Sequence, residues 1–125
     1  MRRALHYWAP VLAWMGVIFA ASSRPQVPYQ GHVPDWLPHV AVYLVLALLA
    51  GRAFGSGGAL DLRLTALTFA LCVGYGVSDE WHQSFVPGRH PDVWDVFKDA
   101  VGALLGVAAY RAWSYRVAAD EAGLP

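Results

Sequence analysis

The stretch ALHYWAPVLAWMGVIFAASS, from Ala4 to Ser23, contains no Asp, Glu, Lys or Arg. Its length matches the roughly 20 residues that an α-helix needs to cross a bilayer. Three further apolar stretches follow at 36–51, 64–78 and 93–113. Each of these alone could be a core helix of a soluble bundle, but together they leave little polar sequence to cover one. The sequence therefore predicts an all-α integral membrane bundle of four transmembrane helices, roughly 4–23, 36–54, 62–81 and 93–113, in a single domain over 1–125.

Composition agrees with a membrane protein. Apolar residues make up 57% of the chain and charged residues only 14%, whereas charged residues are about 25% of an ordinary soluble domain. The formal net charge is zero, and a nucleic-acid-binding domain would be strongly basic. We therefore expect membrane lipids, and no nucleic acid, among the partners, while the oligomeric state stays open.

The first apolar segment also fits a second interpretation. Two arginines precede it and Phe-Ala-Ala-Ser ends it, which is the pattern of a cleaved signal peptide. A soluble mature protein would then have to bury three more apolar segments, and the single cysteine, Cys72, forms no intramolecular disulfide to stabilise it. Retention of the segment as a transmembrane helix is the better prediction.

Positive residues predict the orientation, because loops rich in Lys and Arg stay in the cytoplasm. With the N-terminus inside, six arginines are cytoplasmic: Arg2, Arg3, Arg52, Arg63, Arg111 and Arg116. Only three positive residues then lie outside: Arg24, Arg89 and Lys98. We expect both termini in the cytoplasm and the acid-rich stretch VSDEWHQSFVPGRHPDVWD, residues 77–95, on the extracytoplasmic side.

Helical spacing brings polar residues to the same depth on three of the expected helices. Asp79, His82 and Gln83 stand at i, i+3 and i+4, so they share one face. The pairs His39 with Tyr43 and Asp95 with Asp99 are each four residues apart. Ionisable groups in a membrane normally turn toward one another or toward a water-filled cavity. The sequence predicts an outward-opening pocket lined by His39, Tyr43, Asp79, Glu80, His82, Gln83, Asp95 and Asp99.

Three kinds of chemistry are open to Asp79, Glu80 and His82. A carboxylate in apolar surroundings can exchange a proton, and a nearby histidine can relay it, which makes these three the catalytic candidates. The same groups could ligate a divalent ion, but Asp-Glu-x-His is not a zinc spacing, so we predict no metal and no cofactor. An internal salt-bridge network with Arg89 that only stabilises the bundle is the third interpretation.

Arg89 lies in FVPGRHPD, where two prolines and a glycine indicate a rigid turn. A guanidinium at the membrane face suits a phosphate or carboxylate, which it can bind through two parallel hydrogen bonds. Ser22, Ser23 and Arg24 end the first helix on the same side and could add donors. A lipid-linked phosphate or a peptidyl carboxylate is the ligand that these residues suggest.

Several residues nearby have structural interpretations. Asp92 follows a proline and is a plausible N-cap of the fourth helix, with Asp95 in its first turn. Lys98 could extend toward the headgroups. Gly102 and Gly106 form a Gly-x-x-x-Gly pair that allows two helices to approach closely.

The sequence resembles the VanZ-like family of bacterial membrane proteins, which is named for an accessory protein of teicoplanin resistance. The matching segments are WAPVLAWMGVIFAASSRP, LPHVAVYLVLALL and, most specifically, VSDEWHQSFVPGRHPDVWDVFKDAVGALLG. The resemblance implies a small inner-membrane protein linked to the cell envelope and to glycopeptide resistance, without a settled activity. The positions that correspond to the family pattern are Ser23, His39, Tyr43, Asp79, Glu80, Gln83, Pro87, Gly88, Arg89 and Asp95. Asp99 stands where asparagine is common in the family.

The resulting expectation is an envelope protein that binds an anionic, lipid-linked ligand outside the cytoplasm. The ligand-binding candidates are Arg89, His39, Tyr43, Gln83, Asp95, Asp99 and Ser23. An intramembrane hydrolase or transferase using Asp79, Glu80 and His82 is one alternative, and a structural or partner-binding protein is another. A proton-coupled transporter is less favoured, because no ionisable residue lies deep in the cytoplasmic half of the first three helices.

Overall fold

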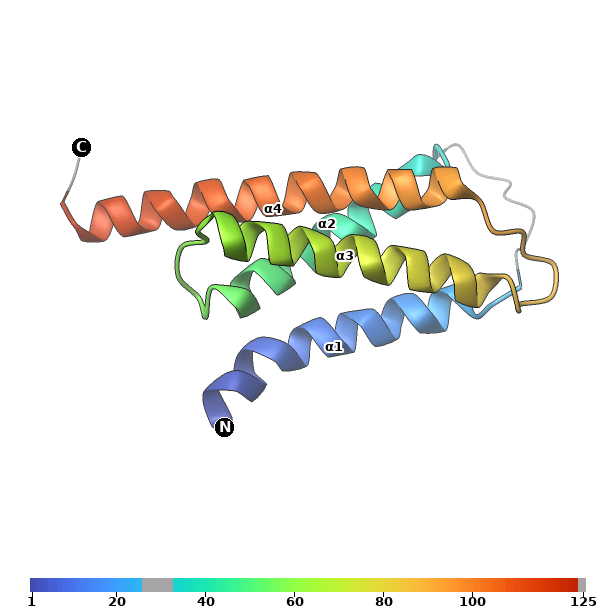
Figure 1. The fold of residues 1–125 in the computed structure, drawn as a ribbon, viewed down its shortest axis with the longest axis horizontal. Helices are drawn as coiled ribbons and strands as arrows, with labels where there is room; N and C mark the ends of the chain where they lie inside the picture. Colours follow the sequence, from blue (N-terminus) through green and yellow to red (C-terminus); the bar gives the residue numbers. More distant parts are fainter. Residues whose placement is uncertain (26–32, 124–125) are drawn as a thin grey trace.

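A computed structural model describes residues 1–25 and 33–123, and these residues form four α-helices. The helices are α1 (Arg2–Ser22), α2 (Trp36–Phe54), α3 (Leu62–Gln83) and α4 (Val93–Glu121). They lie roughly lengthwise beside one another, and α1 begins at the same end of the bundle at which α4 ends (Figure 1). The predicted all-α architecture is confirmed.

Helix boundaries follow local sequence chemistry. The side chain of Asp61 accepts a hydrogen bond from the Leu64 amide at 2.7 Å and caps α3, and Asp92 caps α4 by accepting from the Trp94 amide at 2.9 Å. Capping side chains of this kind satisfy amides that have no partner within the helix. The predicted N-cap at Asp92 is therefore confirmed.

The end of α4 differs from its predicted limit at residue 113. The helix runs to Glu121, because the segment SYRVAADE contains no glycine or proline to stop it. Gly123, with φ +67°, supplies the left-handed residue that commonly follows a helix end. Smaller differences occur at the other ends: α1 stops at Ser22 and α3 continues to Gln83.

The most extensive helix contact joins α2 and α4. A Cβ atom added to Gly102 would lie 2.3 Å from the Val40 carbonyl oxygen, and one added to Gly106 would lie 2.5 Å from the Leu44 carbonyl oxygen. Both distances are shorter than atoms tolerate, so only glycine permits this approach. The predicted role of the Gly-x-x-x-Gly pair is confirmed, and we call this contact the α2–α4 seam.

Apolar and polar side chains are distributed unlike those of a soluble bundle. Large apolar side chains are exposed along the helices, among them Leu12, Phe19, Trp81, Leu104 and Trp113. Buried side chains include several polar or charged ones: Ser22, Thr68, Asp79, Glu80, Gln83, Asp99 and Ser114. Among the described residues, α1 and α2 are long and apolar enough to cross a membrane.

Candidate functional site

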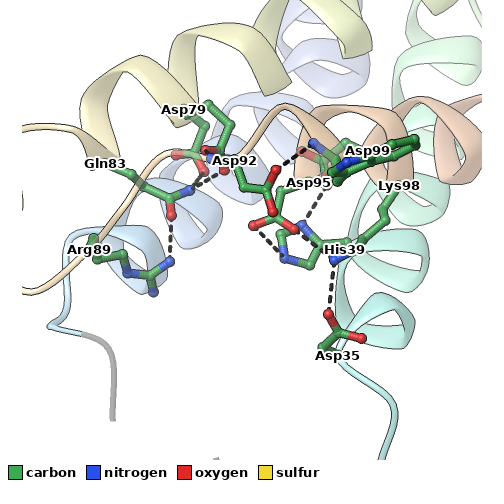
Figure 2. A network of polar contacts seen from close by, with 11 residues as sticks. Asp35, His39, Asp79, Gln83, Arg89, Asp92, Asp95, Lys98 and Asp99 are labelled. Atoms are coloured by element: carbon green, nitrogen blue, oxygen red, sulfur yellow. Dashed lines mark hydrogen bonds and ion pairs between the residues drawn. The ribbon is translucent and has the colours of Figure 1, made fainter. Parts of the chain in front are cut away.

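The polar side chains gather at the end of the bundle where α3 leads into α4 (Figure 2). They come from the last turn of α1, the first turns of α2 and α4, the last turns of α3 and the segment after α3. Figure 2 shows Asp79, Gln83 and Arg89 in one chain of contacts and His39, Asp95, Lys98, Asp99 and Asp35 in another. The predicted residues are therefore close together, but they form two connected groups rather than one uniform ring.

Asp79 is the buried centre of the first group, with 7% of its surface exposed. Its Oδ1 accepts a hydrogen bond from the Ser22 hydroxyl at 2.6 Å, and its Oδ2 accepts from the Gln83 amide nitrogen at 3.0 Å. These bonds connect α1 to α3. Both donors are neutral, so neither compensates the charge of an ionised carboxylate.

Arg89 reaches the same group through Gln83. Its Nη1 donates to the Gln83 side-chain oxygen at 2.5 Å, and its Nε donates to the Arg24 carbonyl oxygen at 3.1 Å. The ion pairs among the described residues join His39 or Lys98 to aspartates, and none contains Arg89. The salt-bridge network with Arg89 that the sequence left open is therefore not formed in this part of the chain. The guanidinium is positioned by neutral oxygens.

Glu80 is also buried but faces the beginning of α4. Its Oε1 accepts from the Gln83 amide nitrogen at 3.1 Å, and its Oε2 accepts from the Asp92 backbone amide at 3.0 Å. The carboxylate thus satisfies a backbone donor just before α4 begins. In this arrangement Glu80 positions the α3–α4 connection.

The second group connects α2 to α4. The His39 Nδ1 atom lies 2.9 Å from Oδ1 of Asp99, and its Nε2 atom lies 3.7 Å from Oδ2 of Asp95. Lys98 pairs with Asp95 at 2.8 Å and with Asp35 at 3.0 Å instead of extending away from the protein. Its hydrogen bond and positive charge lower the pKa of Asp35, which precedes α2.

His82 and Ser23 lie outside both groups. The Ser23 hydroxyl and the His82 Nε2 atom are 2.9 Å apart, and the His82 ring lies over Phe19 with 4.4 Å between ring centroids. Ser23 is exposed, while its neighbour Ser22 is the serine that contacts Asp79. Of the three catalytic candidates, Asp79 and Glu80 therefore share Gln83 as a hydrogen-bond partner, while His82 contacts neither of them.

A cavity of about 240 Å³ lies between α1, α2 and the ends of α3 and α4. One wall is apolar and is formed by Trp14, Val17, Ile18, Ala21, Pro38 and Val42. The polar lining consists of Ser22, His39, Tyr43, Asp79, Gln83, Arg89 and Asp99. Glu80, His82 and Asp95 do not line it. The described residues contain no group of three or more His, Cys, Asp or Glu side chains arranged to hold a metal ion.

Tyr43 forms part of the inner lining. It is 3% exposed, and its hydroxyl has no hydrogen-bond partner among the described residues. Gly76 makes space beside it, because a Cβ atom there would lie 3.2 Å from Oδ2 of Asp99 and 3.5 Å from Cε1 of Tyr43. The polar lining of the cavity thus includes the Tyr43 phenol and the two acids Asp79 and Asp99.

Sequence reasoning underestimated Ser22 and missed the apolar wall. Helical spacing places Trp14, Ile18 and Ser22 at i, i+4 and i+8 on one stripe of α1, but it does not show which stripe of α1 faces α3. The hydroxyl at the end of this stripe faces Asp79. Asp35 was also missed as a partner of Lys98, since nothing in the sequence brings residues 35 and 98 together.

The chain that carries this cavity matches a known protein family. The sequence model of the VanZ/LLP1 family matches residues 7–114, which include every residue of the cavity. The chain belongs to the VanZ/LLP1 family. The predicted resemblance is thereby confirmed, and together with the two membrane-length helices it identifies a membrane protein. No curated protein and no solved structure matches the chain.

Proposed function

We propose that this VanZ/LLP1 protein binds an anionic, lipid-linked ligand of the bacterial cell envelope in the cavity between α1 and α2. Arg89 is the group that holds the anion. All four helices cross the cytoplasmic membrane, both termini are cytoplasmic and the cavity faces outward. This location would place the ligand where cell-wall precursors are used and where glycopeptides such as teicoplanin act.

The state of Arg89 carries the proposal. A guanidinium offers five N–H donors in a fixed plane and remains charged at any physiological pH. Here it borders the cavity and is not paired with a carboxylate of the described residues. Its contacts with Gln83 and the Arg24 carbonyl fix its position without neutralising it. A cation held in this way is prepared for an oxyanion.

The apolar wall supports a ligand with a hydrocarbon chain. Val17, Ile18 and Val42 line the cavity from α1 and α2, whereas Arg89 and Gln83 border it from the segment around the end of α3. Hydrocarbon on one side and a cation on the other complement an amphiphile, with its headgroup at the end of the bundle. The exposed apolar side chains along the helices support the same orientation relative to a bilayer.

The enzymatic alternative is less well supported by the geometry. A hydrolase that used Asp79, Glu80 and His82 together would need all three near one substrate, but only Asp79 lines the cavity. Glu80 is occupied by the Asp92 amide, and His82 contacts Ser23. Binding is therefore the function that these contacts favour.

The first experiment identifies what the protein carries from its own membrane. The protein is purified in native lipid, and the associated lipids are compared by mass spectrometry for wild type, Arg89→Ala and Arg63→Ala. Arg63 is an exposed arginine at the opposite end of α3, so it serves as the matched control. We expect one anionic lipid to be enriched in wild type and Arg63→Ala and to be lost from Arg89→Ala.

Equal, bulk lipid content in all three samples would contradict the proposal and favour a structural or partner-binding role. The topology is tested separately with single cysteines at Ser84 and Ser56 in a Cys72→Ser background. An impermeant thiol reagent added to intact cells should label the first and not the second. The reverse labelling would contradict the proposed orientation.

A further inference from the structure

Gln83 lies between a cation and a buried acid and holds them apart. Its side-chain oxygen accepts from Arg89 at 2.5 Å, while its amide nitrogen donates to Asp79 at 3.0 Å. Figure 2 shows the three side chains in this order. A neutral amide thus occupies the place where the guanidinium and the carboxylate could have formed an ion pair. One positive and one negative group remain on the same cavity, separated by the amide.

Asp79 lacks a positive partner among the described residues. Its hydrogen bonds come from the Ser22 hydroxyl and the Gln83 amide, and the ion pairs of this region involve other aspartates. Removing one partner of a buried charge pair is costly because it leaves the other charge uncompensated. A cationic group in the cavity would compensate Asp79.

Tyr43 gives a second, independent indication of a missing ligand group. Its hydroxyl is buried, lines the cavity with Asp79 and Asp99, and has no hydrogen-bond partner among the described residues. Buried polar atoms in native proteins are nearly always satisfied by protein, water or ligand. The unpartnered phenol indicates that a polar group belongs beside it.

We propose that the inner part of the cavity binds a primary ammonium group. The ligand class is then an amphiphile in which an ammonium lies a few bonds from the oxyanion that Arg89 holds. A primary ammonium carries three N–H donors and one positive charge. It can donate to Asp79, to the Tyr43 oxygen and to Asp99. Its positive charge also gives Asp79 the cationic partner that it lacks among the described residues. This inference depends on the anion-binding role proposed for Arg89.

Other headgroups complement these residues less completely. A sugar or glycerol hydroxyl could satisfy Tyr43 but would leave the charge of Asp79 uncompensated. A quaternary ammonium would supply the charge but has no N–H to donate. A second anion would be repelled by Asp79 and Asp99. The primary ammonium is the group that meets both requirements.

The test uses the full-length wild-type protein in a neutral detergent. The probes are three phospholipids with identical short acyl chains: phosphatidylethanolamine, phosphatidylcholine and phosphatidylglycerol. Each offers the same phosphate to Arg89, while the adjoining group is a primary ammonium, a quaternary ammonium or a pair of hydroxyls. Binding is measured by native mass spectrometry. We expect phosphatidylethanolamine to bind about tenfold tighter than either of the others, as charge-assisted hydrogen bonds imply.

Two conservative variants locate the preference. Asp79→Asn keeps an oxygen that can accept from Ser22 and removes the charge. The affinity for phosphatidylethanolamine should therefore fall to that for phosphatidylcholine, and the affinity for phosphatidylcholine should not change. Tyr43→Phe removes only the hydroxyl and should reduce the preference severalfold. Asp120→Asn, near the far end of α4, is the control and should leave the preference for phosphatidylethanolamine unchanged. Thermal unfolding and gel filtration verify that each variant is folded.

The wild-type comparison decides the proposal even if a variant does not fold. Equal binding of phosphatidylethanolamine and phosphatidylcholine would overturn it, as would tightest binding of phosphatidylglycerol. A preference that survives Asp79→Asn would overturn the assignment to this acid. Arg89→Ala tests the two subsites separately. If this variant binds all three phospholipids with unchanged affinities and still prefers phosphatidylethanolamine, the proposed anion site is refuted and the ammonium site is supported.

Discussion

The α2–α4 seam and the α1–α2 cavity involve two neighbouring faces of α2 that are built differently. At the seam, Gly102 and Gly106 allow the backbone of α4 to approach Val40 and Leu44 without intervening side chains. Beside this contact, His39, Val42 and Tyr43 of α2 line a cavity that α1 closes only in part. The contact between α1 and α3 is the smallest of the helix contacts.

This difference indicates how the protein combines a fixed framework with a binding site. The seam leaves no room for adjustment, so α2 and α4 hold His39 and Asp99 at a constant separation. The cavity, in contrast, contains a cation, a buried acid and a phenol that the described protein groups do not fully compensate. Close backbone packing thus characterises the seam, and the groups available to a ligand are concentrated on the neighbouring face of α2.

The largest effect is expected from adding one methyl group to the seam. Gly102→Ala places a Cβ atom 2.3 Å from the Val40 carbonyl oxygen and 2.9 Å from the Val40 Cα atom. Both belong to a helix backbone, so α2 and α4 must separate, at a cost of about 3 kcal/mol. The measurement is thermal unfolding of the purified protein in detergent.

Gly74→Ala is the matched control for this variant. Gly74 also lies within a helix, but a Cβ atom there would have no heavy atom within 4 Å. Alanine in such a position should stabilise the helix by roughly 0.5–1 kcal/mol. If both variants unfolded at the same temperature, the close approach of α2 and α4 would be disproved.

The second prediction concerns the two serines at the end of α1. Ser22→Ala removes a buried hydrogen bond to Asp79 and should lower the free energy of unfolding by about 1–3 kcal/mol. Ser23→Ala changes an exposed hydroxyl and should stay within about 0.5 kcal/mol of wild type. Urea or thermal unfolding of the two variants in parallel measures the difference. A larger loss for Ser23→Ala would show that α1 is rotated relative to this structure.

These serines also show how much of the structure could be predicted from the sequence alone. Length and charge-free runs predict four helices, because both follow from local chemistry, and the predicted starts of α2, α3 and α4 agree with the structure. Periodicity predicts which polar residues share a face, and His39, Asp95 and Asp99 do come together. Helix spacing does not fix how two helices rotate against each other. For that reason Ser22 could not be preferred to Ser23.

Contacts between distant segments could not be predicted from the sequence for the same reason. The separation of Arg89 from Asp79 by Gln83 depends on where the segment after α3 turns back, and the pairing of Lys98 with Asp35 depends on the depth at which α2 begins. The charges were visible in the sequence, but their partners were not. The unpartnered hydroxyl of Tyr43 is likewise a property of the assembled helices.

A third prediction tests whether an added methyl group, which the seam does not tolerate, is tolerated beside the cavity. Gly76→Ala would place a Cβ atom 3.2 Å from Oδ2 of Asp99 and 3.5 Å from Cε1 of Tyr43, which are side-chain atoms that can shift slightly. The gain in helix propensity offsets this crowding, so stability should change by less than about 1 kcal/mol. Lipid retention should nevertheless fall severalfold, because the added methyl group displaces the side chains of Asp99 and Tyr43, which line the cavity. Unchanged retention would place the ligand elsewhere.

The smallest effect is expected at the rim of the second group. Lys98 lowers the pKa of Asp35 from its ordinary value of 3.8, so the ion pair stabilises the folded protein above that pH and this contribution is lost as the pH falls through the lowered value. Asp35 is fully exposed, and such pairs contribute little. Asp35→Asn should therefore lower the unfolding temperature slightly at pH 7, and the difference from wild type should vanish well below pH 3.8. Unfolding temperatures measured across this range, at low and high salt, provide the check. If the difference in unfolding temperature between Asp35→Asn and wild type grew toward acidic pH, Asp35 would stabilise the protein through its protonated form. Asp95 would then be the only carboxylate that holds Lys98 beside His39.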